Sequence, residues 1–117
     1  MSTTSLQRIN IKPLSVNQAW QGKRFKTINY TIFEKSVMLQ LSSMIIPDAP
    51  YRLTLNLAFS NKSSDIDNPV KLISDILQKR YKINDRDIYE LIVKKVIVKK
   101  GKEYFEFKIE KIGRAHV

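Results

Sequence analysis

The sequence predicts one small α/β domain, of the α+β type, with a mixed β-sheet and two helices in the order β-α-β-α-β-β. Segments in which apolar and polar residues alternate, as in strands, are interspersed along the chain with two segments whose apolar residues have helical periodicity. The length of 117 residues suits a single core. An apolar content of 43%, with three Gly and four Pro, excludes a disordered or collagen-like chain.

The first half of the chain is expected to contain two strands and one helix. Residues 6–12 read as a strand that ends at Pro13. Residues 29–44 carry apolar side chains at three- and four-residue spacing, which predicts an amphipathic helix. Residues 51–59 alternate strictly between apolar and other side chains, as a half-buried strand does.

The second half is expected to contain one helix and two further strands. Asn68 as N-cap and Pro69 as first residue predict a helix that runs to about Lys79. Residues 88–98 form a β-branched run, and residues 103–110 alternate with aromatic residues on one face. The KKGK turn between them predicts an antiparallel hairpin.

Net charge indicates a polyanionic partner. The chain carries 21 Lys and Arg against 11 Asp and Glu, a formal charge of +10. Nucleic acid is favoured over a membrane surface, because no helix sets a basic face against a Trp, Phe and Leu face. The absence of Cys excludes thiolate chemistry, and no apolar run approaches the length of a membrane span, so we expect no membrane contact and a cytoplasmic location.

A basic segment before the first helix is open to two interpretations. Residues 13–27 have the composition of a loop or loose hairpin. Trp20 can pack back on the core of a solvated loop. Alternatively, Lys23, Arg24 and Lys26, interleaved with aromatic residues, can form an arm that contacts phosphates.

The carboxylates are concentrated in one stretch of this basic chain. Residues 64–87 hold five of the eleven acids: Asp65, Asp67, Asp75, Asp85 and Asp87. Crowded carboxylates repel one another unless a cation compensates, and hard oxygen ligands suit Mg²⁺ or Mn²⁺ next to a substrate phosphate. A metal-assisted site that faces a phosphate polymer is therefore predicted.

The spacing of these acids suggests how they reach one ion. In an extended segment, Asp65 and Asp67 point the same way. Asp85 starts the next strand, which we expect to return beside the end of the preceding one. Lys71 is expected at the third helical position, where the helix dipole disfavours a cation.

The same residues also fit purely structural roles, and both interpretations stay open. Asp65 and Asp67 can be capping carboxylates with Asp85 in a turn, and Lys71 can pair with Asp67 or Asp75. A calcium-binding EF-hand is excluded, because the required Gly and bidentate Glu are missing.

The motifs resemble the RusA family of Holliday junction resolvases. They are Pro13-Leu14-Ser15-Val16-Asn17, then Asp65-Ile66-Asp67-Asn68-x-x-Lys71-x-x-x-Asp75-x-Leu77, then Asn84-Asp85-x-x-Ile88. The resemblance covers the chain up to Lys111 and implies a bacterial or phage-encoded, homodimeric, Mg²⁺-dependent endonuclease. Such an enzyme makes paired symmetric nicks in four-way DNA junctions.

The resemblance also implies roles for single residues. Asp65, Asp67 and Asp85 would hold the metal, and Lys71 would be needed for cleavage. The later acidic pair is Asn84-Asp85 here where the family often has two acids, so Asp87 is an alternative to Asp85. Phosphate contacts are expected from basic residues along the chain: Lys23, Arg24, Lys26, Lys62, Lys79, Arg80 and Lys82.

Two further hypotheses concern function. The chain could be a non-catalytic nucleic-acid-binding module, or a small protein that binds an acidic protein partner.

Residues 1–111 are expected to form the domain. Residues 112–117, IGRAHV, can be encoded by a common sequencing-adapter sequence and are expected to be a non-native tail. This sets aside His116, the one histidine, and with it histidine-based catalysis.

Overall fold

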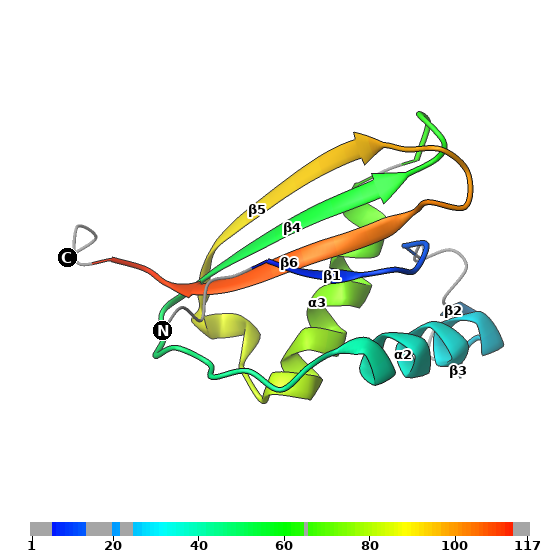
Figure 1. The fold of residues 1–117 in the computed structure, drawn as a ribbon. Helices are drawn as coiled ribbons and strands as arrows, with labels where there is room; N and C mark the ends of the chain where they lie inside the picture. The colour runs from blue at the N-terminus through cyan, green and yellow to red at the C-terminus, as the bar shows by residue number, and fades with distance from the viewer. Residues whose placement is uncertain (1–5, 14–19, 22–24, 65, 114–117) are drawn as a thin grey trace.

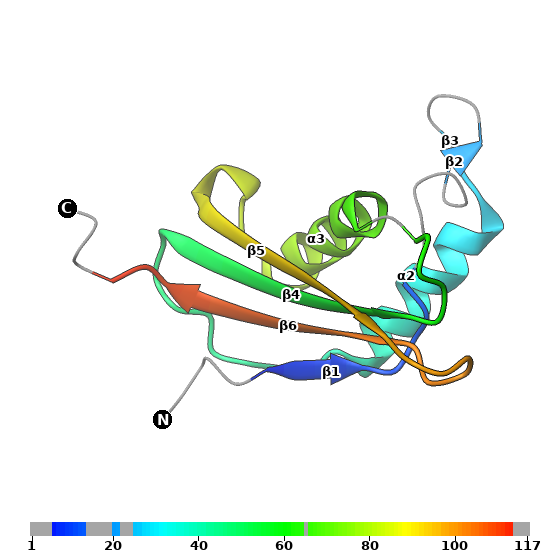
Figure 2. The ribbon, with the colours of Figure 1, turned by 90° about the horizontal axis from the view of Figure 1, so that it is seen from above.

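A four-stranded mixed sheet carries two helices on one of its faces (Figure 1, Figure 2). The computed structural model describes residues 6–13, 20–21, 25–64 and 66–113. The sheet order is β1-β6-β4-β5, from β1 (Gln7–Ile9), β4 (Tyr51–Phe59), β5 (Ile88–Ile97) and β6 (Tyr104–Lys111). β4 pairs parallel with β5 and antiparallel with β6, and β6 pairs antiparallel with β1. The predicted fold class is confirmed.

The first long helix, α2 (Ile28–Gln40), ends four residues before the predicted end. Thr27 caps its start, because the Thr27 hydroxyl oxygen accepts from the Tyr30 backbone N–H at 3.2 Å. At the other end, the Ser42 hydroxyl donates to the Gln7 side chain at 3.0 Å, and the Ser42 carbonyl accepts from the Tyr81 hydroxyl at 2.7 Å. These tertiary partners take the place of helical hydrogen bonds, so the chain leaves the helix early.

The core lies between the sheet and the two helices. The apolar face of β4 predicted from alternation is buried, as Leu53, Leu55 and Leu57 are at most 1% exposed. The second helix, α3 (Asp67–Tyr81), buries the stripe predicted for it. Its fully buried residues are Leu72, Ile73, Ile76 and Leu77. Burial of a stripe of this kind stabilises a helix more than its intrinsic propensity does.

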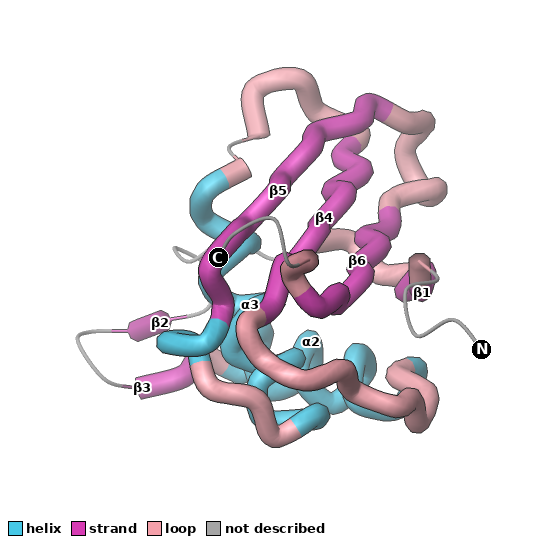
Figure 3. The backbone as a smooth tube through the Cα atoms, turned by 90° about the vertical axis from the view of Figure 1, so that its left-hand side faces the viewer, coloured by secondary structure: helices cyan, strands magenta, loops and turns pink. Residues whose placement is uncertain are grey.

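The predicted hairpin between the last two strands is wrong. β5 and β6 flank β4 on opposite sides, and the connection over residues 98–103 crosses the end of β4 (Figure 3). The Val98 N–H donates to the Phe59 carbonyl at 2.8 Å along this path. The helical crossover through α3 places β5 parallel to β4, and β6 then takes the central position because Phe105 and Phe107 are fully buried there.

The segment before α2 contains a short hairpin. β2 (Trp20–Gln21) pairs antiparallel with β3 (Phe25–Lys26), which confirms the loose hairpin. The side chains of these residues lie outside the described part, so the two interpretations of this arm remain predictions. Strand β1 is shorter than predicted, because the Ile11 N–H turns back to the Ile9 carbonyl at 2.9 Å.

The end of the chain is described as far as Gly113. Ile112 is 5% exposed, and its N–H donates to the Pro50 carbonyl at 3.0 Å. Residues 114–117, His116 among them, lie outside the described residues, and a domain boundary at Lys111 remains a proposal. Within the described ranges, neither helix has the length and apolar character needed to cross a membrane.

Candidate active site

The acid motif enters α3 directly. Asp65 lies outside the described residues, and so does the side chain of Asp67. The helix begins at Asp67, and Ile66 before it has φ −82° and ψ −25°, in the right-handed helical region. The predicted extended geometry is therefore wrong at Ile66, and so is the prediction of Asn68 as N-cap. The helix starts at Asp67, two residues before the predicted first residue, Pro69.

Lys71 is consequently the fifth helical residue and not the third. The helix dipole acts mainly within the first turn, so a cation at this position meets less opposition than the sequence suggested. Lys71 and Asp75 are both exposed and lie four residues apart, on the same face of the helix. Lys71 is thus accessible to a ligand near the N-terminal end of α3.

The later acids lie in a short 3-10 helix, η1 (Asp85–Asp87), just before β5. Asn84 caps it, since the Asn84 side-chain oxygen accepts from the Arg86 backbone N–H at 3.0 Å. The asparagine that departs from the family pair thus has a local structural role. Asp85 is exposed and Asp87 is half-buried, so Asp85 is the more accessible carboxylate.

The structure does not bring Asp67 and Asp85 together within one chain. In the parallel pair, Tyr51 lies opposite Ile88 and Phe59 lies opposite Ile97. Asp85 therefore lies beside the start of β4, and the prediction that it returns beside the end of β4 is wrong. The 15 residues of α3 run between the two positions, a rise of about 22 Å (Figure 1).

Carboxylates are suitable donors for Mg²⁺, but one chain does not collect them. Among the described side chains there is no group of three acidic or histidine residues able to hold a metal ion. Asp65 and the Asp67 side chain were not part of that set. The donor chemistry fits a hard divalent cation, whereas the distribution of donors divides them between the two ends of α3.

The loop that leads into the acid motif is tied down from β5 and from the connection that leads into β6. The Lys95 ammonium of β5 donates to the carbonyls of Lys62 and Ser64, both at 2.6 Å. The Ser60 hydroxyl donates to Glu103 Oε2 at 2.7 Å, and this bond lowers the pKa of the Glu103 carboxyl. Sequence reasoning missed Lys95 and Glu103, because nothing in their local pattern separates them from ordinary strand and turn residues.

The predicted phosphate-binding residues fall into three groups. Lys23, Arg24 and the Lys26 side chain lie outside the described part. Lys62 is exposed in the loop before the acid motif. The remaining three are at the C-terminal end of α3: Lys79, Arg80 and Lys82.

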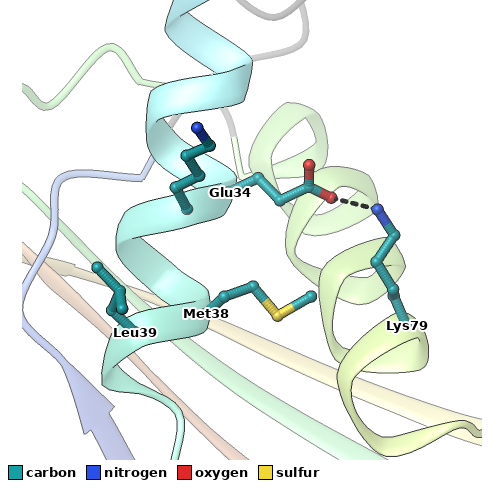
Figure 4. A pocket seen from close by; sticks show the side chains of 5 residues that line it. Glu34, Met38, Leu39 and Lys79 are labelled. Carbon is teal, nitrogen blue, oxygen red and sulfur yellow. Dashed lines mark hydrogen bonds and ion pairs between the residues drawn. The ribbon is translucent and has the colours of Figure 1, made fainter.

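The contacts of the α3 group modify the prediction. Lys79 Nζ forms an ion pair with Glu34 at 2.9 Å, at the edge of a hollow between α2 and α3 (Figure 4). The Arg80 guanidinium lies 5.0 Å from the centre of the Tyr81 ring. Lys82 is exposed and ends the helix with φ 56°, in the left-handed region. Lys82 is therefore the most available of the three for phosphate, because Lys79 is ion-paired and Arg80 is half-buried.

A second hollow lies at the Phe59 end of the sheet, near residues 60–64, the acid loop that leads into the acid motif. It is lined by residues of β1, of the connection after β5, and of β6, among them Arg8, Lys102 and Tyr104. Lys99, Lys100 and Lys102 of this connection are all exposed. Sequence reasoning used these lysines only to define a turn, and the fold places them at the end of β4 where the acid loop starts.

A comparison with protein families decides the relationship. The profile of the family described as endodeoxyribonuclease RusA matches residues 23–106. The chain belongs to this family. The match spans the acid motif, Lys71 and Asp85, so every residue named above as a metal ligand or catalytic group lies within it. A search of curated proteins gave no match.

Family membership supports the resemblance deduced from the motifs. It indicates an endodeoxyribonuclease. It also makes DNA the polyanion that a chain of net charge +10 binds.

Proposed function

We propose that the protein resolves four-way DNA junctions by metal-dependent, paired symmetric nicks. The observation that carries this proposal is the family match over residues 23–106, which contains the whole predicted site. The accessible position of Lys71 on α3 and the exposed Asp85 on η1 support it. The finer specificity for junctions over linear duplexes is part of the proposal.

The residue roles follow from charge and position. Asp65, Asp67 and Asp85 would hold Mg²⁺, with Mn²⁺ as a possible substitute. The bound ion supplies Lewis-acid stabilisation of the phosphate and a more acidic water. Lys71 would place its ammonium against the charge that develops on the phosphate or on the leaving oxygen.

The separation of the acids supports a homodimer. One chain holds Asp67 and Asp85 at opposite ends of α3. A second copy that runs antiparallel to the first would bring its own Asp85 to the Asp67 end. Each site of such a dimer would combine acids from two chains, and a symmetric pair of sites is what paired nicks in two strands need.

Strand β5 is the edge that suits this pairing. Within the described part of the chain it pairs only with β4, and it exposes large apolar residues. Those with 40% exposure or more are Tyr89, Leu91, Ile92, Val96 and Ile97. A long exposed apolar edge strand readily adds another strand. We therefore place the proposed interface along β5.

Charge favours one register for two antiparallel copies of β5. A two-fold axis at Ile92 sets Glu90 of each copy opposite Lys94 of the other. An axis at Val93 would set Glu90 opposite Val96, so that Glu90 would keep only its ion pair with Arg52 of its own chain. Opposite charges that face each other across a strand pair are stabilising. With the axis at Ile92, η1 of the second copy comes beside the residues that follow Ile97, next to the end of β4.

DNA contacts would come from both ends of each chain. Lys62 and the lysines at residues 99–102 lie at the Asp67 end, and Arg80 and Lys82 lie at the Asp85 end. The antiparallel dimer would join these groups into one basic surface. Affinity for DNA would then fall steeply with salt, because phosphate contacts release counterions.

The decisive experiment compares a synthetic four-way junction with a matching linear duplex, in Mg²⁺ and in EDTA. We expect metal-dependent nicks confined to the junction. Asp67→Asn should reduce the rate at least about 100-fold, since several kcal/mol of charge stabilisation are lost and each 1.4 kcal/mol is tenfold.

A matched control and a contrary outcome complete this experiment. Asp48→Asn removes an exposed carboxylate from the loop between α2 and β4, so it should leave the rate unchanged. Junction binding should persist in the Asp67→Asn variant. Binding by the unaltered protein without cleavage in Mg²⁺ or Mn²⁺ would favour the non-catalytic DNA-binding module.

A further inference from the structure

A lysine of β5 holds the loop that leads into the acid motif. Lys95 Nζ lies 2.6 Å from the Lys62 carbonyl oxygen and 2.6 Å from the Ser64 carbonyl oxygen. The same ammonium is 5.9 Å from the centre of the Phe59 ring, at the end of β4. One side chain thus joins β5 to the last described residue before Asp65.

The loop has an internal frame that Lys95 completes. The Ser64 N–H donates to the Asn61 carbonyl at 3.2 Å, and the Asn61 side-chain oxygen accepts from the Ser63 N–H at 2.9 Å and from its hydroxyl at 2.8 Å. These bonds shape residues 61–64 but do not attach the loop to the sheet. The Lys95 ammonium provides an attachment through two further carbonyls.

An ammonium group is suited to this position. It has three donors and no acceptor, so two carbonyl bonds leave one donor available. Carbonyl oxygens are strong partners for a charged donor, and these bonds are stronger than those between neutral groups. Both carbonyl oxygens lie within hydrogen-bond reach of the ammonium.

We propose that Lys95 is a positioning residue for the metal site, an inference that rests on the proposed function. It fixes the chain at Ser64, one residue before Asp65 and three before Asp67. Mg²⁺ demands near-ideal octahedral geometry, and catalytic groups must be held to within about 0.5 Å. Lys95 meets this demand from outside the ligand set, through the backbone of the loop.

Lys35 offers a control for charge outside the proposed interface. It is exposed on α2, away from strand β5 and from the loop that leads into the acid motif. Lys35→Met and Lys95→Met each remove one positive charge, but only the second removes the attachment of the loop.

The test measures metal binding separately from cleavage. Mn²⁺ is titrated into the DNA-free protein by calorimetry, and the Mg²⁺ concentration for half-maximal junction cleavage is determined. We expect Lys95→Met to weaken Mn²⁺ binding and to raise the half-maximal Mg²⁺ concentration, each about tenfold or more, as the loss of residues that orient metal ligands does. Lys95→Arg, which keeps two or more donors, should recover much of the loss. Junction affinity in EDTA should be equal for Lys35→Met and Lys95→Met.

The contrary outcomes separate the two proposals. Equal Mn²⁺ affinity and equal Mg²⁺ dependence in Lys35→Met and Lys95→Met, with active unaltered protein, would overturn the positioning role alone. An unaltered protein that neither binds Mn²⁺ nor cuts junctions would overturn the proposed function, and the positioning role with it. Circular dichroism verifies the fold of each variant. Lys95→Gln, whose amide ends short of the ammonium position, replaces Lys95→Met if the latter does not fold.

Discussion

The two ends of the parallel β4 and β5 pair differ in how they are built. At the Phe59 end, three strands are tied together by Lys95, by the Ser60 to Glu103 bond and by the bond from Val98 to Phe59. At the Tyr51 end, Arg52 of β4 also bridges to Glu90 of β5 at 2.6 Å and to Glu110 of β6 at 3.8 Å, but the adjoining η1 is capped by its own Asn84 and carries the exposed Asp85. One end is a fixed frame for the acid motif, and the other presents a single carboxylate outward.

This difference suggests that the two ends supply different groups to a site shared between two copies. The fixed end would hold Asp65 and Asp67 in place, while the outward end would supply Asp85 to a neighbouring chain. The distance of about 22 Å along α3 prevents both ends of one chain from meeting at one ion. Substitutions at one end only, and substitutions that weaken the association of two copies, therefore test whether the two ends of different chains form one site.

The largest expected effect is the recovery of junction cleavage when two inactive variants are mixed. Asp67→Asn and Asp85→Asn should each be inactive alone. In a mixed dimer with shared sites, one site carries both substitutions and the other carries neither, so one strand is nicked. Random exchange of equal amounts makes about half of the dimers mixed, which restores about a quarter of the sites. Gel analysis of nicked and resolved junctions measures this.

The same mixture gives no activity if each site is built from one chain, because both sites of a mixed dimer are then altered. That result would contradict the shared site. Asp87→Asn in place of Asp85→Asn identifies which of the two acids of η1 is required. We expect the exposed Asp85 to be the one.

A charge at the centre of the β5 edge should have the next largest effect. Ile92→Lys places like charges opposite each other at the proposed two-fold axis, which should weaken self-association about tenfold or more. Sedimentation equilibrium measures the change. Leu39→Lys, on an exposed position of α2, is the control for added charge and should leave association unchanged. Unaltered association of Ile92→Lys would place the interface elsewhere.

The bond between Ser60 and Glu103 should have the smallest effect. The Ser60 hydroxyl lowers the pKa of Glu103 in the folded protein. The contribution to stability is therefore present above the ordinary glutamate pKa and is lost as pH falls through the lowered value. When pH is lowered from about 6 to about 3, the Tm of Ser60→Ala should fall less than the Tm of the unaltered protein. An equal fall in both proteins would show that the bond contributes nothing.

The elements with strong local patterns could be predicted. The alternation over residues 51–59 gave the strand and its buried face, and the apolar stripe gave α3. Helix ends were less predictable, since α2 ends where Ser42 finds partners on β1 and α3. The acid motif was recognised by its residue types, but its backbone is helical at Ile66, which no spacing rule indicates.

By itself the sequence determined the fold class, the order of elements, the buried faces and the family, because these depend on periodicity and residue type along the chain. Tertiary structure alone decided three other features. It placed β6 on the far side of β4 from β5, it set Asp85 at the opposite end of α3 from Asp67, and it joined Lys95 to the acid loop. Each of these depends on which strand edge accepts the next segment, and that choice follows from packing between residues far apart in the chain.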